Sequence, residues 1–391
     1  MKRFEQAEVM GKLPEQFFAK LVKKVSYYVE QGFDVINLGQ GNPDQPTPQH
    51  IVDALKEGAD RPDFHKYSPF RGHGFLKQAA ADFYKREYGV TLDPEKEVAV
   101  LFGGKVGLVE LSQCYLNQGD VALVPDPGYP DYWSGVAMAG ATMETMPLRK
   151  ENDFLPKYDE LPETVLNKAK LMFLNYPNNP TAGVATKSFF KETVELANKH
   201  DILVCHDFAY GAIGFDGQKP VSFLQIEGAK DVGIEIYTLS KTYNMAGWRV
   251  GFAVGNETVI ESINLLQDHF YVSLFGAVQH AAAEALNGPQ RCVDELVDTY
   301  ERRRNAFIGR LNENGWKVES PKGSFFCWLP VPDGYTSETF ADYLLEKAHV
   351  VVAPGIGFGS EGDRYVRAGL LTSEERLIEA ADRIAKLIID N

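Results

Sequence analysis

The chain lacks the sequence features of membrane, secreted and nucleic-acid-binding proteins. No stretch among its 391 residues approaches the roughly 20 apolar residues needed to cross a bilayer, and residues 1–18 lack the uninterrupted apolar core of a signal peptide. The sequence has no Lys- and Arg-rich run of the kind that binds nucleic acid or anionic membranes, and the net charge of −14 also argues against these partners. The sequence therefore predicts a cytoplasmic protein that binds neither.

Cysteine is also scarce. The four cysteines, Cys114, Cys205, Cys292 and Cys327, are far apart and show no CxxC spacing. This is not the pattern of a disulfide framework or of a structural zinc site, and free cysteines are usually buried. We expect unreactive thiols in a reducing compartment.

What is present is the composition of an ordinary globular protein, with 44% apolar and 24% charged residues, in a chain long enough for two hydrophobic cores. Between about residues 98 and 255, short apolar runs alternate with amphipathic segments. This alternation is typical of βαβ units and predicts an α/β domain with a buried parallel sheet. The runs are VAVLF (98–102), VALVP (121–125), KLMFLNY (170–176), ILVCHD (202–207) and IEIYTLS (234–240).

The rest of the chain predicts a smaller α/β domain. Residues 257–314 are expected to be largely helical with a break at 288–290, and residues 373–390 have the pattern of an amphipathic helix. Strand-like runs lie between them: WKVES (316–320), SFFCWLP (324–330) and VVVAPG (350–355). We therefore expect an N-terminal arm at 1–45 that packs with the small domain, a large domain at 46–287 and a small C-terminal domain at 288–391.

The segment TLSKTYNMAGWRVG places hydroxyl residues and Lys241 at the end of an expected strand. Alone, Lys241 is more easily explained as a solvated surface lysine. Other parts of the sequence, however, supply what pyridoxal 5′-phosphate (PLP) needs: an amine for a Schiff base, an acid for the ring nitrogen, donors for the phosphate and a flat side chain against the ring. We therefore predict that Lys241 holds PLP.

The acid is predicted to be Asp207, because it ends the apolar run ILVCHD and ligands of open α/β sheets bind at the carboxyl ends of strands. Tyr210 would donate a hydrogen bond to the phenolic oxygen of the ring and lower the pKa of the Schiff base. The alternatives are a helix cap for Asp207 and a half-buried tyrosine bonded to solvent or backbone.

A phosphate site is predicted at the turn LFGGKVGL. The backbone N–H groups of Gly104 and Lys105 and the positive end of the following helix would attract an anion there, although an ordinary βα turn has the same appearance. Thr238 and Ser240 add hydroxyl donors, and Arg249 adds a charged fork.

Over essentially its whole length the sequence resembles the fold-type I, class I/II aminotransferases. The resemblance rests on motifs in the family's order: NLGQGNPD, KYSPFRG, GGKVGL, DPGYPDY, NYPNNPTAG, DFAY, SKTYNMAGWRVG and RYVRAGL. It implies a large PLP-binding domain with a mostly parallel seven-stranded sheet flanked by helices, and a smaller α/β C-terminal domain. It also implies a homodimer with shared active sites.

The same resemblance assigns further residues. Tyr67 would reach the phosphate of the neighbouring subunit's cofactor, and Tyr129 would stack on the ring. Asn179 would bond the phenolic oxygen, Gly41 would lie near the substrate, and Arg367 would bind the substrate α-carboxylate bidentately. The sequence departs from the family at Ala182, where Gly is usual, so the turn after Asn179 is expected to differ locally; Thr238 stands where Ser is commoner and keeps the hydroxyl.

The implied reaction moves an amino group between an amino acid and a 2-oxo acid with ping-pong kinetics. Lys241, as general base, would carry the proton between the substrate Cα and the cofactor's C4′ carbon. Asp207 would keep the ring nitrogen protonated, and Tyr210 would complete the catalytic set.

Substrate choice depends on the pocket. Its candidate residues are mostly apolar or aromatic, though equally consistent with a core: Phe17, Phe18, Tyr28, Gln40, Phe275 and Phe325. They favour a neutral, moderately large side chain, and the whole pattern resembles bacterial methionine-salvage aminotransferases, which convert 4-methylthio-2-oxobutanoate into methionine. A carboxylate side chain would need a second arginine, for which Arg71 is available. The alternatives are aspartate, alanine, aromatic or L,L-diaminopimelate transamination, a PLP-dependent carbon–sulfur β-lyase, and a non-enzymatic ligand-sensing domain.

Overall fold

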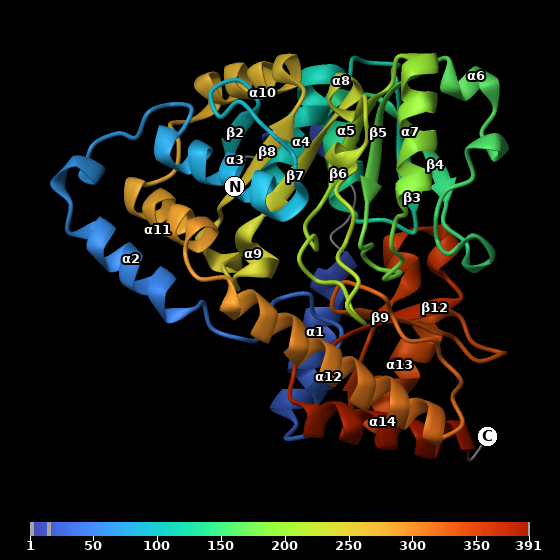
Figure 1. Ribbon diagram of the computed structural model, residues 1–391. Helices are drawn as coiled ribbons and strands as arrows, with labels where there is room; N and C mark the ends of the chain where they lie inside the picture. The colour runs from blue at the N-terminus through green and yellow to red at the C-terminus, as the bar shows by residue number, and fades with distance from the viewer. Residues whose placement is uncertain (1–3, 14–16, 390–391) are drawn as a thin grey trace.

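The computed structural model describes residues 4–13 and 17–389, which form a larger and a smaller α/β part (Figure 1). Seven strands make the sheet of the larger part, in the order β2-β8-β7-β6-β5-β3-β4. β8 runs opposite to the other six strands and pairs antiparallel with β2 and β7, whereas the remaining pairs are parallel. The predicted mostly parallel seven-stranded sheet is therefore confirmed. The strands are β2 (Val98–Leu101), β3 (Val121–Asp126), β4 (Thr142–Pro147), β5 (Ala169–Asn175), β6 (Leu203–Asp207), β7 (Gly233–Thr238) and β8 (Gly251–Gly255).

Helices cover both faces of this sheet (Figure 1). The helices of the larger part are α2 (Gln49–Ala59), α3 (Gly74–Tyr88), α4 (Gly104–Tyr115), α5 (Asp131–Ala139), α6 (Glu163–Leu166), α7 (Lys187–His200), α8 (Ala229–Val232), α9 (Leu239–Thr242), α10 (Glu257–Phe270) and α11 (Gly276–Asn287). Along β6, Val204 joins one core with Phe190 of α7, and Cys205 joins the opposite core with Leu108 of α4. Burial on both faces explains why the strands are continuous apolar runs.

The smaller part contains the C-terminal quarter of the chain and the N-terminal segment. Its elements are α12 (Arg291–Glu313), β9 (Phe326–Pro330), α13 (Ser337–Ala348), β10 (Val350–Val351), β11 (Ala353–Pro354), β12 (Tyr365–Gly369) and α14 (Glu374–Ile389), with α1 (Phe17–Glu30) and β1 (Ile36–Asn37). β1 pairs with β10, and Lys24 of α1 forms a 2.6 Å ion pair with Asp342 of α13. The boundaries at 45/46 and 287/288 stay a prediction.

The prediction of a strand at residues 316–320 is wrong. WKVES (316–320) is irregular, because the side chain of Asn312 takes both backbone groups of Val318 that a strand ladder would use, at 2.9 and 3.1 Å. Two strands of the seven-stranded sheet were not expected from the sequence: β4 is an edge strand and mostly exposed, and β8 is only five residues long and has a glycine at each end. The helical expectation over 257–314 is met by α10, α11 and α12.

No helix in residues 4–13 and 17–389 is long and apolar enough to cross a membrane. The four cysteines are free thiols, and Cys205 and Cys327 are buried.

Candidate active site

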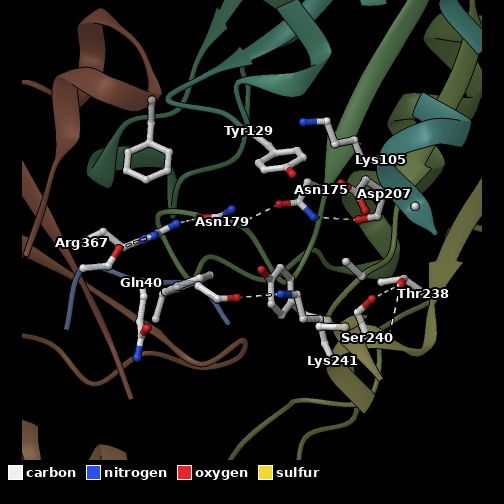
Figure 2. Close-up of a pocket in the computed structure, with 18 of the residues that line it drawn as sticks. Gln40, Lys105, Tyr129, Asn175, Asn179, Asp207, Thr238, Ser240, Lys241 and Arg367 are labelled. Carbon is white, nitrogen blue, oxygen red and sulfur yellow. Dashed lines mark hydrogen bonds between the residues drawn. The ribbon is translucent and has the colours of Figure 1, made fainter. Parts of the chain in front are cut away.

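A cavity of about 440 Å³ lies at the carboxyl ends of β5, β6 and β7, between the two parts of the fold. Apart from Tyr67, the residues predicted to bind the cofactor or the substrate α-carboxylate line it, together with Gln40: Gly41, Gly104, Lys105, Tyr129, Asn179, Asp207, Tyr210, Thr238, Ser240, Lys241, Arg249 and Arg367. Figure 2 shows the labelled side chains around one shared space. The topology explains this meeting, because parallel strands end at the same edge of the sheet.

Lys241 lies in the short helix α9, directly after β7. Its Nζ donates a 2.7 Å hydrogen bond to the carbonyl of Gly41. Burial, with repulsion from Arg367 and Arg249, lowers the pKa of Lys241 to about 8. A lysine in this state has an accessible neutral amine near physiological pH, which is the form that acts as a nucleophile or base.

Asp207 ends β6 and is 7% exposed. Burial raises the pKa of its carboxyl to about 6, against the effect of a 2.8 Å hydrogen bond that the Tyr132 hydroxyl donates to Oδ2. Tyr132 was not expected from the sequence, although it follows Tyr129 by three residues. The Tyr132 hydroxyl therefore fixes the carboxylate of a residue that also lines the cavity.

Asn175 joins Asp207 to the next loop and was also missed. Its amide donates 2.8 Å to the Asp207 carbonyl and accepts 2.7 Å from the N–H of Asn179. Asn175 ends β5 as Asp207 ends β6, so a polar residue at a strand end was the available signal.

One end of the cavity is built for an anion. The N-terminus of α4 points its first N–H groups, at Gly104 and Lys105, toward the cavity. A Cβ at Gly103, where φ is +83°, would lie 2.7 Å from Nη2 of Arg249, so this close approach requires glycine. Thr238 donates to the Ser240 hydroxyl at 2.9 Å, which places both hydroxyls at the same end.

The Lys105 side chain is directed elsewhere. Its Nζ forms a 2.8 Å ion pair with Asp131 of α5, so the contribution of Lys105 to the anion site in this structure is its backbone N–H.

Tyr129 and Tyr210 supply aromatic surface. Burial raises the pKa of both hydroxyls, so both stay protonated and act as donors. Tyr210 packs edge-on against Phe325 and Phe326, at ring-centroid distances of 5.2 and 5.8 Å.

Arg367 reaches the cavity from β12 of the smaller part. Its guanidinium donates to Oδ1 of Asn179 at 2.8 Å and to the carbonyl of Gly39 at 3.0 Å. It lies 4.0 Å from the ring centroid of Phe326 and 4.7 Å from that of Phe358. Burial lowers its pKa to about 10, which leaves it charged at physiological pH.

The turn after Asn179 contains the departure at Ala182. Ala182 adopts φ +60° and donates its N–H to the Asn178 carbonyl at 2.9 Å. The turn thus keeps the left-handed conformation that favours glycine, at a local cost of roughly 1 kcal/mol.

The apolar wall of the cavity was not predicted from the sequence. It consists of Leu21, Val22 and Val25 on one face of α1. Of the candidate pocket residues, Gln40 lines the cavity and the ring of Phe325 lies 5.4 Å from Nζ of Lys241. Tyr28 and Phe275 do not line the cavity, and the side chains of Phe17 and Phe18 lie outside the described residues.

The KYSPFRG motif, with Tyr67 and Arg71, lies outside the cavity. Tyr67 is 90% exposed, so its role stays a prediction. Arg71 binds Glu261 at 2.7 and 2.9 Å and Asp268 at 3.1 Å, and these carboxylates occupy its guanidinium.

Residues 33–384 match the family described as aminotransferase class I and II. The chain belongs to this family and is an aminotransferase. It is 67% identical, over 98% of its length and 97% of the relative's, to the L-glutamine–4-(methylsulfanyl)-2-oxobutanoate aminotransferase of Bacillus subtilis (strain 168). It is 46% identical, over 98% of both chains, to the LL-diaminopimelate aminotransferase of Moorella thermoacetica. The solved apo structure of BacF from B. subtilis superposes with a TM-score of 0.95 at 52% identity, covering 99% of this chain and 98% of that one.

Proposed function

We propose that the cavity binds PLP and that Lys241 is its covalent attachment point. The residues fit this group: an amine with a depressed pKa, a buried carboxylate, and a helix N-terminus with two hydroxyls and an arginine meet in one cavity. Asp207 would face the ring nitrogen, Tyr129 the ring face, and Asn179 and Tyr210 the phenolic oxygen. This convergence is the observation that carries the proposal.

When bound, PLP supplies an electron-withdrawing ring that acidifies the Cα–H bond of the amino acid attached to it. Nζ of Lys241 would remove that proton from Cα in one half-reaction and deliver a proton to Cα in the other. Asp207 would hold the proton on the ring nitrogen, and Arg367 would orient the substrate through its α-carboxylate. The roles assigned to Gly41 and Gln40 are contacts with the substrate.

We propose methionine and 4-methylthio-2-oxobutanoate as the amino acid and 2-oxo acid pair, with glutamine as amino donor. The support is the 67% identical relative together with the apolar wall of Leu21, Val22 and Val25, which suits an unbranched thioether. Apart from Arg367, the basic residues lining the cavity are those assigned to the cofactor: Lys105, Lys241 and Arg249.

Transamination of LL-diaminopimelate is the second candidate, favoured by relatives such as the 46% identical enzyme. The distal end of that substrate carries an ammonium and a carboxylate. Burying both against an apolar helix face is costly without partners. We therefore rank it below methionine.

Initial-rate kinetics with glutamine and 4-methylthio-2-oxobutanoate test the proposal. Parallel lines in a double-reciprocal plot, with formation of methionine, are the expected result. Efficient turnover of LL-diaminopimelate but not of methionine would support the second candidate, and release of pyruvate and thiol from cystathionine would support a β-lyase.

We also propose a cytoplasmic homodimer in which Tyr67 completes the partner's site. Tyr67 and Phe70 are 90% and 54% exposed, which is unusual for neighbouring aromatic residues. The inactive variants Tyr67→Ala and Lys241→Ala, mixed under conditions of subunit exchange, should regain activity because one site of each hybrid dimer is intact. A monomer in solution would contradict this.

A further inference from the structure

A loop of the smaller part, residues 355–362, is attached to the larger part beside the cavity. The N–H of Gly128 donates a 2.8 Å hydrogen bond to the carbonyl of Phe358. The carboxylate of Asp126, at the end of β3, accepts a bond from the Ser360 hydroxyl at 2.8 Å and one from the Glu361 N–H at 3.1 Å. All three bonds cross between the two parts of the fold.

Asp126 is only 5% exposed, and burial raises the pKa of its carboxyl despite these donors. A buried carboxylate is stable only where hydrogen bonds compensate its lost hydration. The loop therefore supplies two of the bonds that Asp126 needs. Arg149 adds an ion pair with Glu361 at 3.3 Å, but both side chains are solvent-accessible and their contribution is small.

The close approach of loop and carboxylate depends on Gly359. This residue has φ +135°, and a Cβ built on it would overlap Oδ1 of Asp126. Another glycine of the smaller part, Gly334, also has a positive φ, of +87°, but a Cβ there would meet nothing within 4 Å. An alanine at either position strains the backbone, but only an alanine at Gly359 would also collide with Asp126.

Phe358 is the residue through which the 355–362 loop reaches the cavity. Its ring is buried, lines the cavity and lies 4.7 Å, centroid to guanidinium carbon, from Arg367, which also packs against Phe326. Packing against two rings restricts the plane of a guanidinium, and bidentate binding of a carboxylate requires that plane to be set.

We propose that Asp126 is a positioning residue for the α-carboxylate site: it holds the 355–362 loop on the larger part and thereby keeps Phe358 against Arg367. This inference depends on the proposed function, because it takes Arg367 as the carboxylate receptor. Asp126 itself is not among the residues that line the cavity.

Binding of 4-(methylsulfanyl)butanoate to the PLP-loaded protein tests the inference. This carboxylate lacks the amino and oxo groups and cannot react, so calorimetry measures binding alone. Asp126→Asn, Ser360→Ala and Gly359→Ala are compared with two controls: Gly334→Ala for backbone strain, and Ser373→Ala for loss of an exposed serine that accepts one backbone hydrogen bond in the same part of the fold. The cofactor absorbance and the melting temperature are recorded for each variant.

Asp126→Asn and Gly359→Ala should raise the dissociation constant about tenfold, and the KM for methionine likewise, while kcat and the cofactor absorbance stay near those of the parent protein. Ser360→Ala should have a smaller effect in the same direction, and both controls should bind like the parent. Unchanged binding in Asp126→Asn and Gly359→Ala, or equal weakening in Gly334→Ala, would overturn the inference. If the parent protein binds no 4-(methylsulfanyl)butanoate, or if Arg367→Ala binds it as well as the parent does, Arg367 is not the α-carboxylate receptor. That part of the proposed function would then be wrong, and the inference about Asp126 would be wrong with it.

Discussion

Replacing Asp207 by Asn should stabilise the cofactor-free protein at alkaline pH, while it abolishes transamination. The carboxyl of Asp207 is buried, and its pKa is raised from 3.8 to about 6. The folded protein therefore binds this proton more tightly than the unfolded chain does. Stability is unaffected by Asp207 below the unfolded pKa, falls as the pH rises through the window between 3.8 and about 6, and stays lower above it.

A pKa rise of about two pH units corresponds to about 3 kcal/mol at 1.36 kcal/mol per unit. Asparagine has the same shape, accepts the Tyr132 hydrogen bond and carries no charge. Urea unfolding of the apo protein at pH 8 should therefore show Asp207→Asn more stable by up to about 3 kcal/mol, and at pH 4 little different from the parent. PLP should then stabilise the parent more than the variant.

Asp44→Asn is the control with the opposite sign. Burial opposes ionisation of Asp44, but two 2.8 Å hydrogen bonds from Arg303 outweigh it and lower the pKa. This variant should be less stable than the parent at pH 8. An Asp207→Asn protein that is destabilised at pH 8, or whose stability difference does not change with pH, would refute the reasoning.

Three further predictions concern the cavity. Because the pKa of Lys241 is lowered to about 8, the rate of PLP capture by the apo protein should rise about tenfold per pH unit and level off near pH 8 in stopped-flow absorbance; levelling only near 10.5 would contradict this. Arg367→Lys removes the planar fork and should raise the KM for methionine about 100-fold in steady-state assays, whereas an unchanged KM would place the α-carboxylate elsewhere. Val25→Asp should lower kcat/KM for methionine at least about tenfold with the cofactor absorbance unchanged, because it puts a charge on the apolar wall; equal losses for aspartate and methionine would argue against a side-chain contact.

The sequence predicts the cofactor side of this cavity well because its residues follow strands. Asp207, Thr238 and Lys241 each stand at the end of an apolar run, and parallel strands bring their ends to one edge. Asn175 obeys the same rule and was overlooked. Five of the seven strands were predictable as apolar runs, and the full seven-stranded sheet followed from the family resemblance, because exposed β4 and short β8 carry too few apolar residues to stand out.

Residues that act through tertiary contacts were not predictable. The apolar wall comes from α1, more than 200 residues before Lys241, and nothing in its periodicity says which surface it covers. Phe358 lies in a glycine-rich loop with no pattern, and its place is set by Asp126 far earlier in the chain. WKVES has strand-like composition, but the Asn312 side chain competes for its backbone, which sequence periodicity does not reveal.

The most direct test of the central claim is a single half-reaction. Methionine alone is added to the PLP-loaded protein, the cofactor absorbance is followed, and the 2-oxo acid released is identified, with Lys241→Ala as control. The account predicts conversion of the cofactor to its aminated form with one equivalent of 4-methylthio-2-oxobutanoate per site, and no conversion in the control. A cofactor spectrum that methionine leaves unchanged while aspartate or LL-diaminopimelate converts it would contradict the substrate assignment, and conversion at the parent rate in Lys241→Ala would contradict the catalytic role of the lysine.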